Sequence, residues 1–330
     1  MMKVLVTGAS GRIGANIVRE LLPHGYEIRA AVRPGTPRAA KLKAFPVEIL
    51  ESDLLDRESL ARSVEGCEAV VHNGVLFTGD PVQMVAGSLE ATATLLEAAR
   101  QNGCTRFVFI SSMSVYEGPA YRPGDPIREE EAIPNITSVY GACKLAAEAL
   151  CNAYWFQHRV PAVSLRLPMV VAGAELLRDG FLLETWRERA AQDARPERAA
   201  WREAIEEAWG QGKRLVVPLN ADGTPWKRHF CDVRDAVTAV RLALEAPEAP
   251  GRAYNIASVP LRYDEAADAL AELSGWQIAR LRFPDDYRYE FALNRAAEFL
   301  GYRPRFTGPE MIRDAWKQQA GEEVPGLIAP

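Results

Sequence analysis

The sequence reads Thr7-Gly8-Ala9-Ser10-Gly11-Arg12-Ile13-Gly14 directly after the apolar run Lys3–Val6. The apolar run predicts a short buried strand, and the residues from about Ile13 to Leu22 predict a helix. A glycine turn between a strand and a helix is typical of phosphate-binding sites, because the first helical turn offers unpaired N–H groups and a positive dipole end. The three glycines would allow a tight turn, close approach to a pyrophosphate and close helix–strand packing. The stretch therefore predicts a dinucleotide-binding unit in which Gly8, Ser10, Gly11, Arg12 and Ile13 contact the cofactor.

Strands and helices alternate along the first half of the chain. Helical spacing of apolar residues is clearest in Leu89–Ala99 and Ser138–Phe156. This alternation predicts an α/β fold with a Rossmann-type, doubly wound parallel sheet and right-handed crossovers. Further strands are expected at Tyr26–Val32, Val47–Leu50, Ala69–His72, Arg106–Ile110 and Ala162–Leu167.

The pattern changes after Gly173, where residues 174–212 are rich in Arg, Glu and Ala. Trp201 and Trp209 in this segment fall on one helix face, which either lines a substrate pocket with Trp186 or belongs to the core. We expect residues 1–171 plus about 228–258 to form the dinucleotide-binding domain. Residues of about 172–227 and 259–330 would then form a smaller C-terminal α/β substrate-binding domain. The end of the chain, Pro304–Pro330, shows no apolar core of its own.

The end of the second strand indicates the type of nicotinamide cofactor. NAD sites place an acidic residue there, whereas NADP sites supply a cation for the 2′-phosphate. The segment Arg29–Pro34 contains no carboxylate and has Arg33 at its tip, which favours NADP over NAD. Asp53, with Leu54, is expected either near the adenine or as a helix cap. Asn73 and Gly74 follow the fourth strand at the carboxyl edge, where ligands bind in such sheets.

A second set of polar residues predicts proton-transfer chemistry. Tyr140 and Lys144 lie one turn apart on a predicted helix, downstream of the Ser-rich strand end Ser111–Tyr116. The ordinary pKa of a phenol is about 10, and a nearby ammonium would favour the phenolate. Tyr140 is therefore the candidate acid/base and Lys144 its activator, while Ser112 would orient the same substrate oxygen. Tyr116 is expected to point elsewhere if the segment is still extended.

Together these motifs resemble the extended short-chain dehydrogenase/reductase family, which includes nucleotide-sugar epimerases, dehydratases and dihydroflavonol-reductase-like enzymes. Thr7–Gly14, Ser111–Tyr116 and Tyr140–Lys144 resemble its glycine, serine and catalytic motifs. Arg228–Asp235 is similar to its late Arg-Asp-Phe segment, and Asn294–Tyr302 to its terminal helix. The resemblance implies that Ser111, Tyr140, Lys144 and Pro168 contact the cofactor and that Ser114, Met169, Arg228 and Arg282 face the substrate.

The chain departs from the family pattern at three positions. Ser88 stands where many members carry Asn, and Met113-Ser114 replaces the Asp-Glu pair of dehydratases, which counts against dehydration. Met169 stands at a position that resembles a substrate-side Asn. Arg228 and Arg282 match arginines that nucleotide-sugar enzymes use on the diphosphate, although each could equally serve as a structural ion-pair partner.

Three functions remain open from these residues. The first is an NAD(P)-dependent oxidoreductase, NADP-linked, which moves a hydride between nicotinamide and a carbonyl or secondary alcohol of a sugar or small molecule. The second is a nucleotide-sugar epimerase that retains NAD through turnover, and the third is a cofactor-sensing regulator with an inactive site. The intact Ser112, Tyr140 and Lys144 argue against the regulator.

The composition of the chain argues against several kinds of partner and site. The net charge of −5 disfavours a nucleic-acid partner, and no apolar run is long enough to span a membrane. The five cysteines form no Cys-x-x-Cys pair, and with only four scattered histidines neither a disulfide framework nor a metal site is expected. We therefore expect a cytoplasmic, metal-free protein with a small-molecule substrate, and a homodimer through the long helices is the assembly that the resemblance implies.

Overall fold

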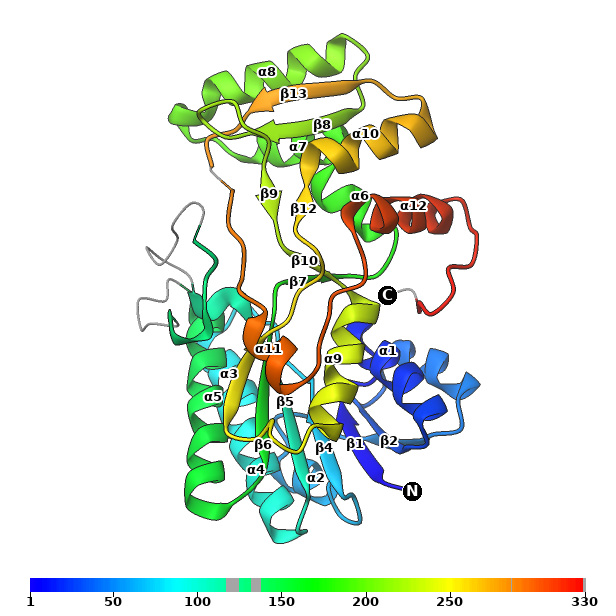
Figure 1. The fold of residues 1–330 in the computed structure, drawn as a ribbon, viewed down its shortest axis with the longest axis vertical. Helices are drawn as coiled ribbons and strands as arrows, with labels where there is room; N and C mark the ends of the chain where they lie inside the picture. The colour runs from blue at the N-terminus through cyan, green and yellow to red at the C-terminus, as the bar shows by residue number, and fades with distance from the viewer. Residues whose placement is uncertain (117–124, 132–137, 286, 329–330) are drawn as a thin grey trace.

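The computed structural model describes residues 1–116, 125–131, 138–285 and 287–328. Its main element is a seven-stranded sheet in the order β11-β6-β5-β4-β1-β2-β3, in which all neighbours are parallel (Figure 1). The order reverses at β1, which has β2 on one side and β4 on the other, so the predicted doubly wound sheet is confirmed. The strands are β1 (Lys3–Thr7), β2 (Glu27–Val32), β3 (Glu48–Glu51), β4 (Ala69–His72), β5 (Arg106–Ser112), β6 (Ala162–Leu167) and β11 (Arg252–Asn255).

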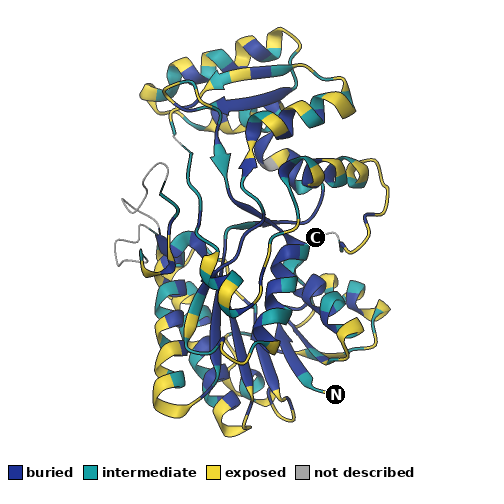
Figure 2. Cartoon of the chain, in the orientation of Figure 1, coloured by how far each residue is buried: buried dark blue, intermediate teal, exposed yellow. Residues whose placement is uncertain are grey.

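Helices cover both faces of this sheet. The helices α1 (Arg12–Leu21) and α9 (Val233–Glu245) pack on one face. The other face carries α2 (Arg57–Arg62), α4 (Ala91–Gln101) and α5 (Val139–His158). Strands β4, β5 and β6 are buried throughout, and Figure 2 shows the central strands dark between the helices. Because both faces are covered, these strands bury apolar side chains on both sides of the sheet.

A second, smaller core lies beyond the carboxyl edge of the sheet. Its strands β8 (Leu215–Leu219) and β13 (Ile278–Arg282) pair in parallel. Trp186 meets the Phe283 ring edge-on at 4.7 Å, and Trp201 meets the same ring at 5.5 Å. The tryptophans of this segment therefore fill the core instead of lining a substrate pocket. The surrounding helices are α6 (Glu175–Gly180), α7 (Leu183–Gln192), α8 (Ala199–Gly210) and α10 (Tyr263–Ser274).

The segment Pro304–Pro330, predicted to lack an apolar core of its own, contributes to both cores, with its last two residues outside the described part. Helix α12 (Gly308–Gln319) buries Met311 and Ile312 in the second core, and Leu327 joins the first. A capping box between Thr307 and Glu310 begins this helix. The Thr-x-x-Glu spacing is present in the sequence and was the signal for this helix.

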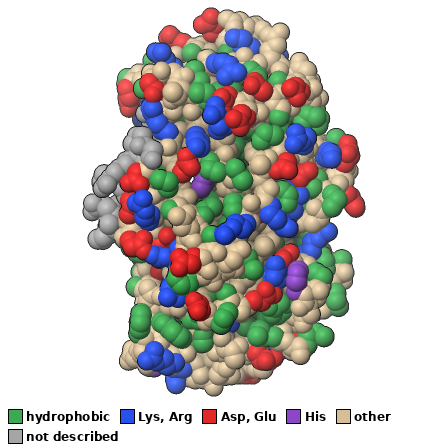
Figure 3. All heavy atoms as spheres, viewed as in Figure 1, with side chains coloured by type: hydrophobic (Ala, Val, Ile, Leu, Met, Phe, Trp, Pro, Cys, Tyr) green, Lys and Arg blue, Asp and Glu red, His purple; other side chains and the backbone are tan. Residues whose placement is uncertain are grey.

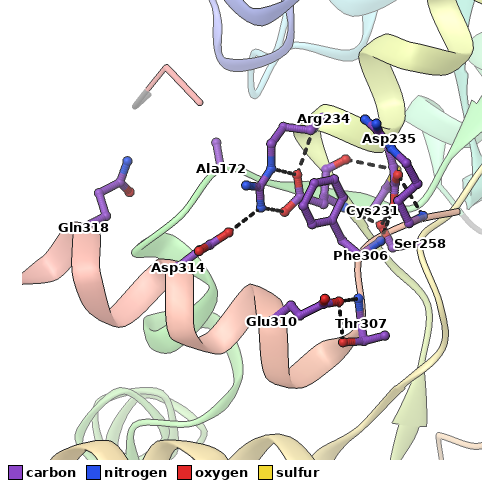
Figure 4. A network of polar contacts seen from close by, with 12 residues as sticks. Ala172, Cys231, Arg234, Asp235, Ser258, Phe306, Thr307, Glu310, Asp314 and Gln318 are labelled. Atoms are coloured by element: carbon purple, nitrogen blue, oxygen red, sulfur yellow. Dashed lines mark hydrogen bonds and ion pairs between the residues drawn. The ribbon is translucent and has the colours of Figure 1, made fainter. Parts of the chain in front are cut away.

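Polar contacts join α12 to the Rossmann part of the molecule (Figure 4). Arg234 donates from Nη2 to the carboxylates of Asp232 and Asp314, each at 2.7 Å. Ser258 donates to Asp235 at 2.6 Å in the adjoining loop. Because these groups come from α9, α12 and the segment after β11, they hold the two parts together where the chain passes between them.

Short elements cross between the two cores and carry residues to the edge of the sheet. They are β7 (Met169–Val171), β9 (Lys227–Arg228), β10 (Phe230–Asp232) and β12 (Leu261–Arg262). Helix α11 (Asn294–Phe299) packs beside β11, and its Ala296 belongs to the first core. Helix α3 (Pro81–Val85) follows the loop after β4. In the described ranges, no helix has the length and apolarity needed to cross a membrane. The division into two domains stays a prediction of the sequence.

Candidate active site

A cavity of about 680 Å³ lies at the carboxyl edge of the sheet, and its walls hold Ser112, Tyr140 and Lys144. Ser112 is the last residue of β5, while Tyr140 and Lys144 lie in the first two turns of α5. The structure thus brings together the three predicted catalytic residues at the edge where parallel sheets bind ligands. On the face shown in Figure 3, acidic and basic side chains are intermixed and form no patch of one sign.

Most of the other predicted residues also reach this cavity. Gly8, Ser10, Gly11 and Gly74 belong to the turns beside it, and Arg33, Asp53 and Leu54 lie just past the ends of β2 and β3. Arg282 ends β13, is exposed and does not line the cavity, so the structure does not bring it to the site. The predicted residues on the cavity wall are Arg12, Ile13, Asn73, Ser111, Ser112, Ser114, Tyr140, Lys144, Pro168, Met169 and Arg228.

The glycine turn fits the pyrophosphate of a dinucleotide. Gly8 has a φ of 63°, and a Cβ there would lie 2.9 Å from the Cα of Gly74. A Cβ on Gly14 would lie 2.1 Å from the carbonyl oxygen of Gly8, so the helix could not approach the turn with any side chain there. The N-cap Gly11 offers no side-chain cap to α1. The first N–H groups of the helix are therefore left for a ligand, as a phosphate site requires.

A buried hydrogen-bond chain holds the end of β4 against this turn. The hydroxyl of Thr7 accepts from the N–H groups of Asn73 at 3.1 Å and Gly74 at 2.9 Å. The Thr7 hydroxyl then donates its own proton to Nδ1 of His72, 2.9 Å away. Nε2 of His72 therefore carries the ring proton and donates it to the Thr92 hydroxyl. Burial lowers the pKa of His72 to about 3, with a smaller contribution from Lys144, so the ring is neutral. His72 was not predicted as functional, and its role is to position the cofactor-side backbone.

The two arginines that the sequence predicts near the cofactor, Arg12 and Arg33, have different surroundings. Arg12 donates to the Val170 carbonyl at 2.7 Å and forms a 2.7 Å ion pair with Glu175. Its charge is therefore already balanced within the protein. Arg33 is exposed just beyond β2. Asp53 accepts from the Leu55 N–H at 2.9 Å in a local turn, while the N-cap of α2 is Asp56, so the alternative that Asp53 caps this helix is wrong.

The phenol of Tyr140 lies in a mixed polar and aromatic environment. Ser112 donates to the Ser114 hydroxyl at 3.1 Å and accepts from the Ser114 N–H at 3.1 Å. Burial raises the pKa of Tyr140, and its hydrogen bond with Ser112 opposes this rise. Phe77 stacks on the Tyr140 ring with centroids 4.9 Å apart, although it is 68% exposed. Sequence reasoning missed Phe77, whose only signal was an apolar triplet following Gly74.

Lys144 is a buried residue of the cavity wall, and its ammonium makes no hydrogen bond to the phenol among those found in the described residues. Its Nζ donates to the Ile110 carbonyl at 2.7 Å and lies 4.8 Å from the Phe109 ring centroid. Burial lowers the pKa of Lys144 to about 8, and Glu148 partly opposes this. The expected depression of the Tyr140 pKa by Lys144 is therefore not found, because desolvation of the phenol dominates. At neutral pH the site holds a protonated phenol beside an ammonium.

We predict that Lys144→Met changes the pH dependence of stability. The folded pKa of about 8 lies below the ordinary 10.5, so between these values the unfolded chain binds more protons and stability rises with pH. The cost of burying the ammonium is thus full below pH 8 and is relieved toward pH 10.5. Replacing the ammonium by Met should stabilise the protein most at pH 7, with the advantage over wild type shrinking by about 1–3 kcal/mol at higher pH. Urea unfolding of both proteins across this range measures the difference, and a constant difference would contradict the assignment.

A buried polar network lies behind Ser111 and Lys144. Glu148 accepts from Ser111 at 2.5 Å and from Arg166 Nη2 at 2.6 Å, and both charged side chains are about 5% exposed. Arg166 also donates to the Tyr116 hydroxyl at 2.6 Å. Tyr116 lines the cavity because Met113–Tyr116 is a 3₁₀ turn, which corrects the expectation for an extended segment. The network joins β5, β6 and α5 and so positions the candidate catalytic residues on two of them.

The substrate side of the cavity contains Arg228 and His229. Arg228 ends β9 and stacks over the Tyr287 ring at 4.7 Å and the Phe230 ring at 5.1 Å. Within the described residues it has no carboxylate partner. His229 follows it directly and also lines the cavity. Sequence reasoning did not single out His229, and its signal was a polar residue within the late motif.

Among the described residues, the side chains that commonly bind metals or form disulfides are arranged for neither. No group of three or more His, Cys, Asp or Glu side chains there is arranged to hold a metal ion. Cys67, Cys104, Cys143, Cys151 and Cys231 are all buried free thiols.

Comparison with known proteins agrees with this geometry. Residues 4–257 match the model of the NAD dependent epimerase/dehydratase family. The chain is 30% identical over 273 residues to cinnamoyl-CoA reductase 1 of Petunia hybrida, covering 79% of this chain and 74% of the relative. It is 33% identical to UDP-glucose 4-epimerase of Erwinia amylovora over 46% of this chain and 48% of the relative.

A short-chain dehydrogenase/reductase superfamily protein of Agrobacterium tumefaciens, solved with bound NAD, superposes with a TM-score of 0.81 at 30% identity, covering 97% of both chains. A cofactor cradle, a Ser-Tyr-Lys cavity and these relationships together place the chain in the NAD-dependent epimerase/dehydratase family, as an NAD(P)-dependent enzyme of the extended short-chain dehydrogenase/reductase type.

Proposed function

We propose that the protein reduces a carbonyl group of a small molecule to a secondary alcohol with NADPH, and catalyses the reverse oxidation. The observation that supports this most is the half-buried, protonated Tyr140 next to Ser112 in a cavity that begins beside the glycine cradle. A phenol that keeps its proton at neutral pH is suited to donate it to a developing alkoxide.

Each catalytic residue has one role in this proposal. When bound, the nicotinamide cofactor supplies or accepts the hydride. Tyr140 donates its proton to the carbonyl oxygen, and Ser112 turns its hydroxyl proton from Ser114 to the same oxygen. The ammonium of Lys144 stabilises the phenolate that remains after proton transfer, while Phe77 limits the access of water to the phenol.

The reductase is favoured over the epimerase by the substrate side of the cavity. Met169 puts an apolar side chain where the resemblance implies an amide, which suits a substrate other than a sugar ring at that point. The relatives named cinnamoyl-CoA reductase match 79–86% of this chain, whereas two relatives named UDP-glucose 4-epimerase match 46%. The epimerase remains the second candidate because Arg228 lies in the cavity and a similar structure contains NAD.

The fate of the cofactor tests the two candidates. The purified protein is denatured and the released dinucleotide is identified, and NADPH consumption is then followed with the ketones acetophenone, benzylideneacetone and dihydroxyacetone, each of which is reduced to a secondary alcohol. We expect little retained cofactor and consumption of NADPH far beyond one equivalent per protein. Stoichiometric retained NAD, with UDP-glucose converted and no net change in cofactor, would instead establish the epimerase.

The preference for NADP is part of this proposal. Arg33, exposed at the end of β2, is followed by Arg38 and Lys41 on a short 3₁₀ segment (Pro37–Ala44), and these cations support a site for the 2′-phosphate at this end of β2. Against this, the Glu51 carboxylate at the end of β3 accepts from the Gly35 N–H at 3.0 Å. A carboxylate is therefore close to the end of β2 even though β2 itself contains none there, and it could serve an NAD ribose.

We predict that Arg33→Ala weakens NADPH binding about 10- to 150-fold, the value of a charge-assisted hydrogen bond, and leaves NADH nearly unchanged. Glu51→Gln is the matched control, because it removes the competing carboxylate and should affect NADH alone. Calorimetric titration of the three proteins with both cofactors measures these effects. Equal binding of NADH and NADPH by the wild type would overturn the preference, and loss of NADH binding in Glu51→Gln would then identify an NAD enzyme.

A further inference from the structure

His229 is a buried polar side chain on the wall of the catalytic cavity with no use in the chemistry described above. It follows β9, is 3% exposed, and packs against Phe291 with ring centroids 5.6 Å apart. Neither ring nitrogen has a hydrogen-bond partner in the described part of the chain. A buried donor or acceptor without a partner costs about 1–3 kcal/mol, so natural proteins rarely leave one in place without a reason. A ligand in the cavity whose walls include His229 would supply a partner for one of these nitrogens.

The charge state of the His229 ring indicates which chemical group of a ligand it can bind. Burial lowers the pKa of His229 to about 4, with Lys227 adding to the effect and Glu290 opposing it, so the imidazole is neutral at physiological pH. A neutral imidazole offers one donor and one acceptor. It therefore suits a hydroxyl group, which can also donate and accept, better than a second anionic group.

The neighbouring residue supplies the charge that His229 lacks. Arg228 is a permanent cation whose Nε has no partner, and it is faced by the rings of Tyr287 and Phe230. A guanidinium in this setting favours an anion within reach, because a buried charge is costly until it is paired. The two adjacent side chains thus present one site for an anionic group and one for a hydroxyl.

We propose that His229 recognises a hydroxyl group of the substrate, so that the cavity selects hydroxylated monoanions, such as sugar acids, over alkyl acids of the same length. This inference rests on the proposed function, because it takes the cavity to be the substrate site. A site built around a hydroxyl rejects the analogue that lacks it far more strongly than an apolar wall rejects a methylene group.

Two six-carbon monocarboxylates test the proposal without any need for turnover. Gluconate carries hydroxyl groups along its chain and hexanoate carries none, while their charge and carbon count are equal. Each is titrated calorimetrically into the protein saturated with NADP⁺. We expect gluconate to bind at least 10-fold more tightly than hexanoate. His229→Phe should abolish this ratio by weakening gluconate alone, and His229→Gln, which keeps a donor and an acceptor, should preserve most of it.

Arg228→Met is the second control, because loss of the charge should weaken both probes in parallel. Circular dichroism and thermal unfolding confirm that each variant is folded before titration. Equal affinity of the wild type for the two probes, no detectable gluconate binding, or an unchanged ratio in His229→Phe would each overturn the proposal. If the ratio behaves as expected but no carbonyl compound is reduced, the proposed function fails while the hydroxyl site stands.

Discussion

Tyr140→Phe is expected to lower kcat by about 10²–10⁴-fold, the usual contribution of a positioned acid/base. The substitution removes only the phenol oxygen and keeps the ring that stacks on Phe77. The dissociation constants of NADPH and NADH should therefore stay within a few-fold of the wild type. Steady-state kinetics with NADPH and the best carbonyl substrate, together with calorimetry, separate these two effects.

Tyr154→Phe provides the matched control for this prediction. Tyr154 lies on the same helix α5 but packs in the core behind α4, away from the cavity. Loss of its hydroxyl should leave kcat within about two-fold, because it touches no reacting group. Retention of more than a tenth of the activity by Tyr140→Phe would show that another group transfers the proton.

Glu148→Ala is expected to lower the free energy of unfolding by about 3–5 kcal/mol, the cost of leaving a buried partner charge unpaired. Arg166 donates to both carboxylate oxygens of Glu148, and neither side chain reaches solvent to a useful extent. The alanine variant would also release Ser111 at the end of β5. Urea unfolding, followed by circular dichroism, measures the change.

The double variant Glu148→Leu/Arg166→Met separates the unpaired charge from a loss of packing. Removing both charges and keeping their volume should recover most of the lost stability. Glu206→Ala, which breaks an exposed ion pair with Arg187, should change stability little because solvent screens that pair. A double variant as unstable as Glu148→Ala would show that the network stabilises through its hydrogen bonds rather than through charge balance.

Short sequence motifs predicted some parts of this protein correctly and failed at others. The glycine turn, the Ser112 strand end and the Tyr140–Lys144 pair were all recognised in the sequence, because each is read over a few neighbouring residues. The helix at Gly308–Gln319 was not predicted, although its capping box is present in the sequence. The polar and proline-containing composition of the segment argued against a helix, and the capping box covers only four residues. Trp186 and Trp201 left two readings open, because helical spacing alone does not say what covers an apolar face.

The sequence by itself determined the alternation of strands and helices in the parallel sheet, the glycine turn and the three candidate catalytic residues, because periodicity and turn chemistry are local properties of the chain. Only the tertiary structure decided which of these groups are charged, paired or free. It pairs Arg12 with Glu175 across 163 residues of chain. It brings Glu51 beside Gly35 and leaves His229 without a hydrogen-bond partner on the cavity wall. It raises the pKa of Tyr140 by burial where a sequence motif predicted a fall. Desolvation and ion pairing depend on neighbours that folding brings from distant positions, so no local pattern encodes them.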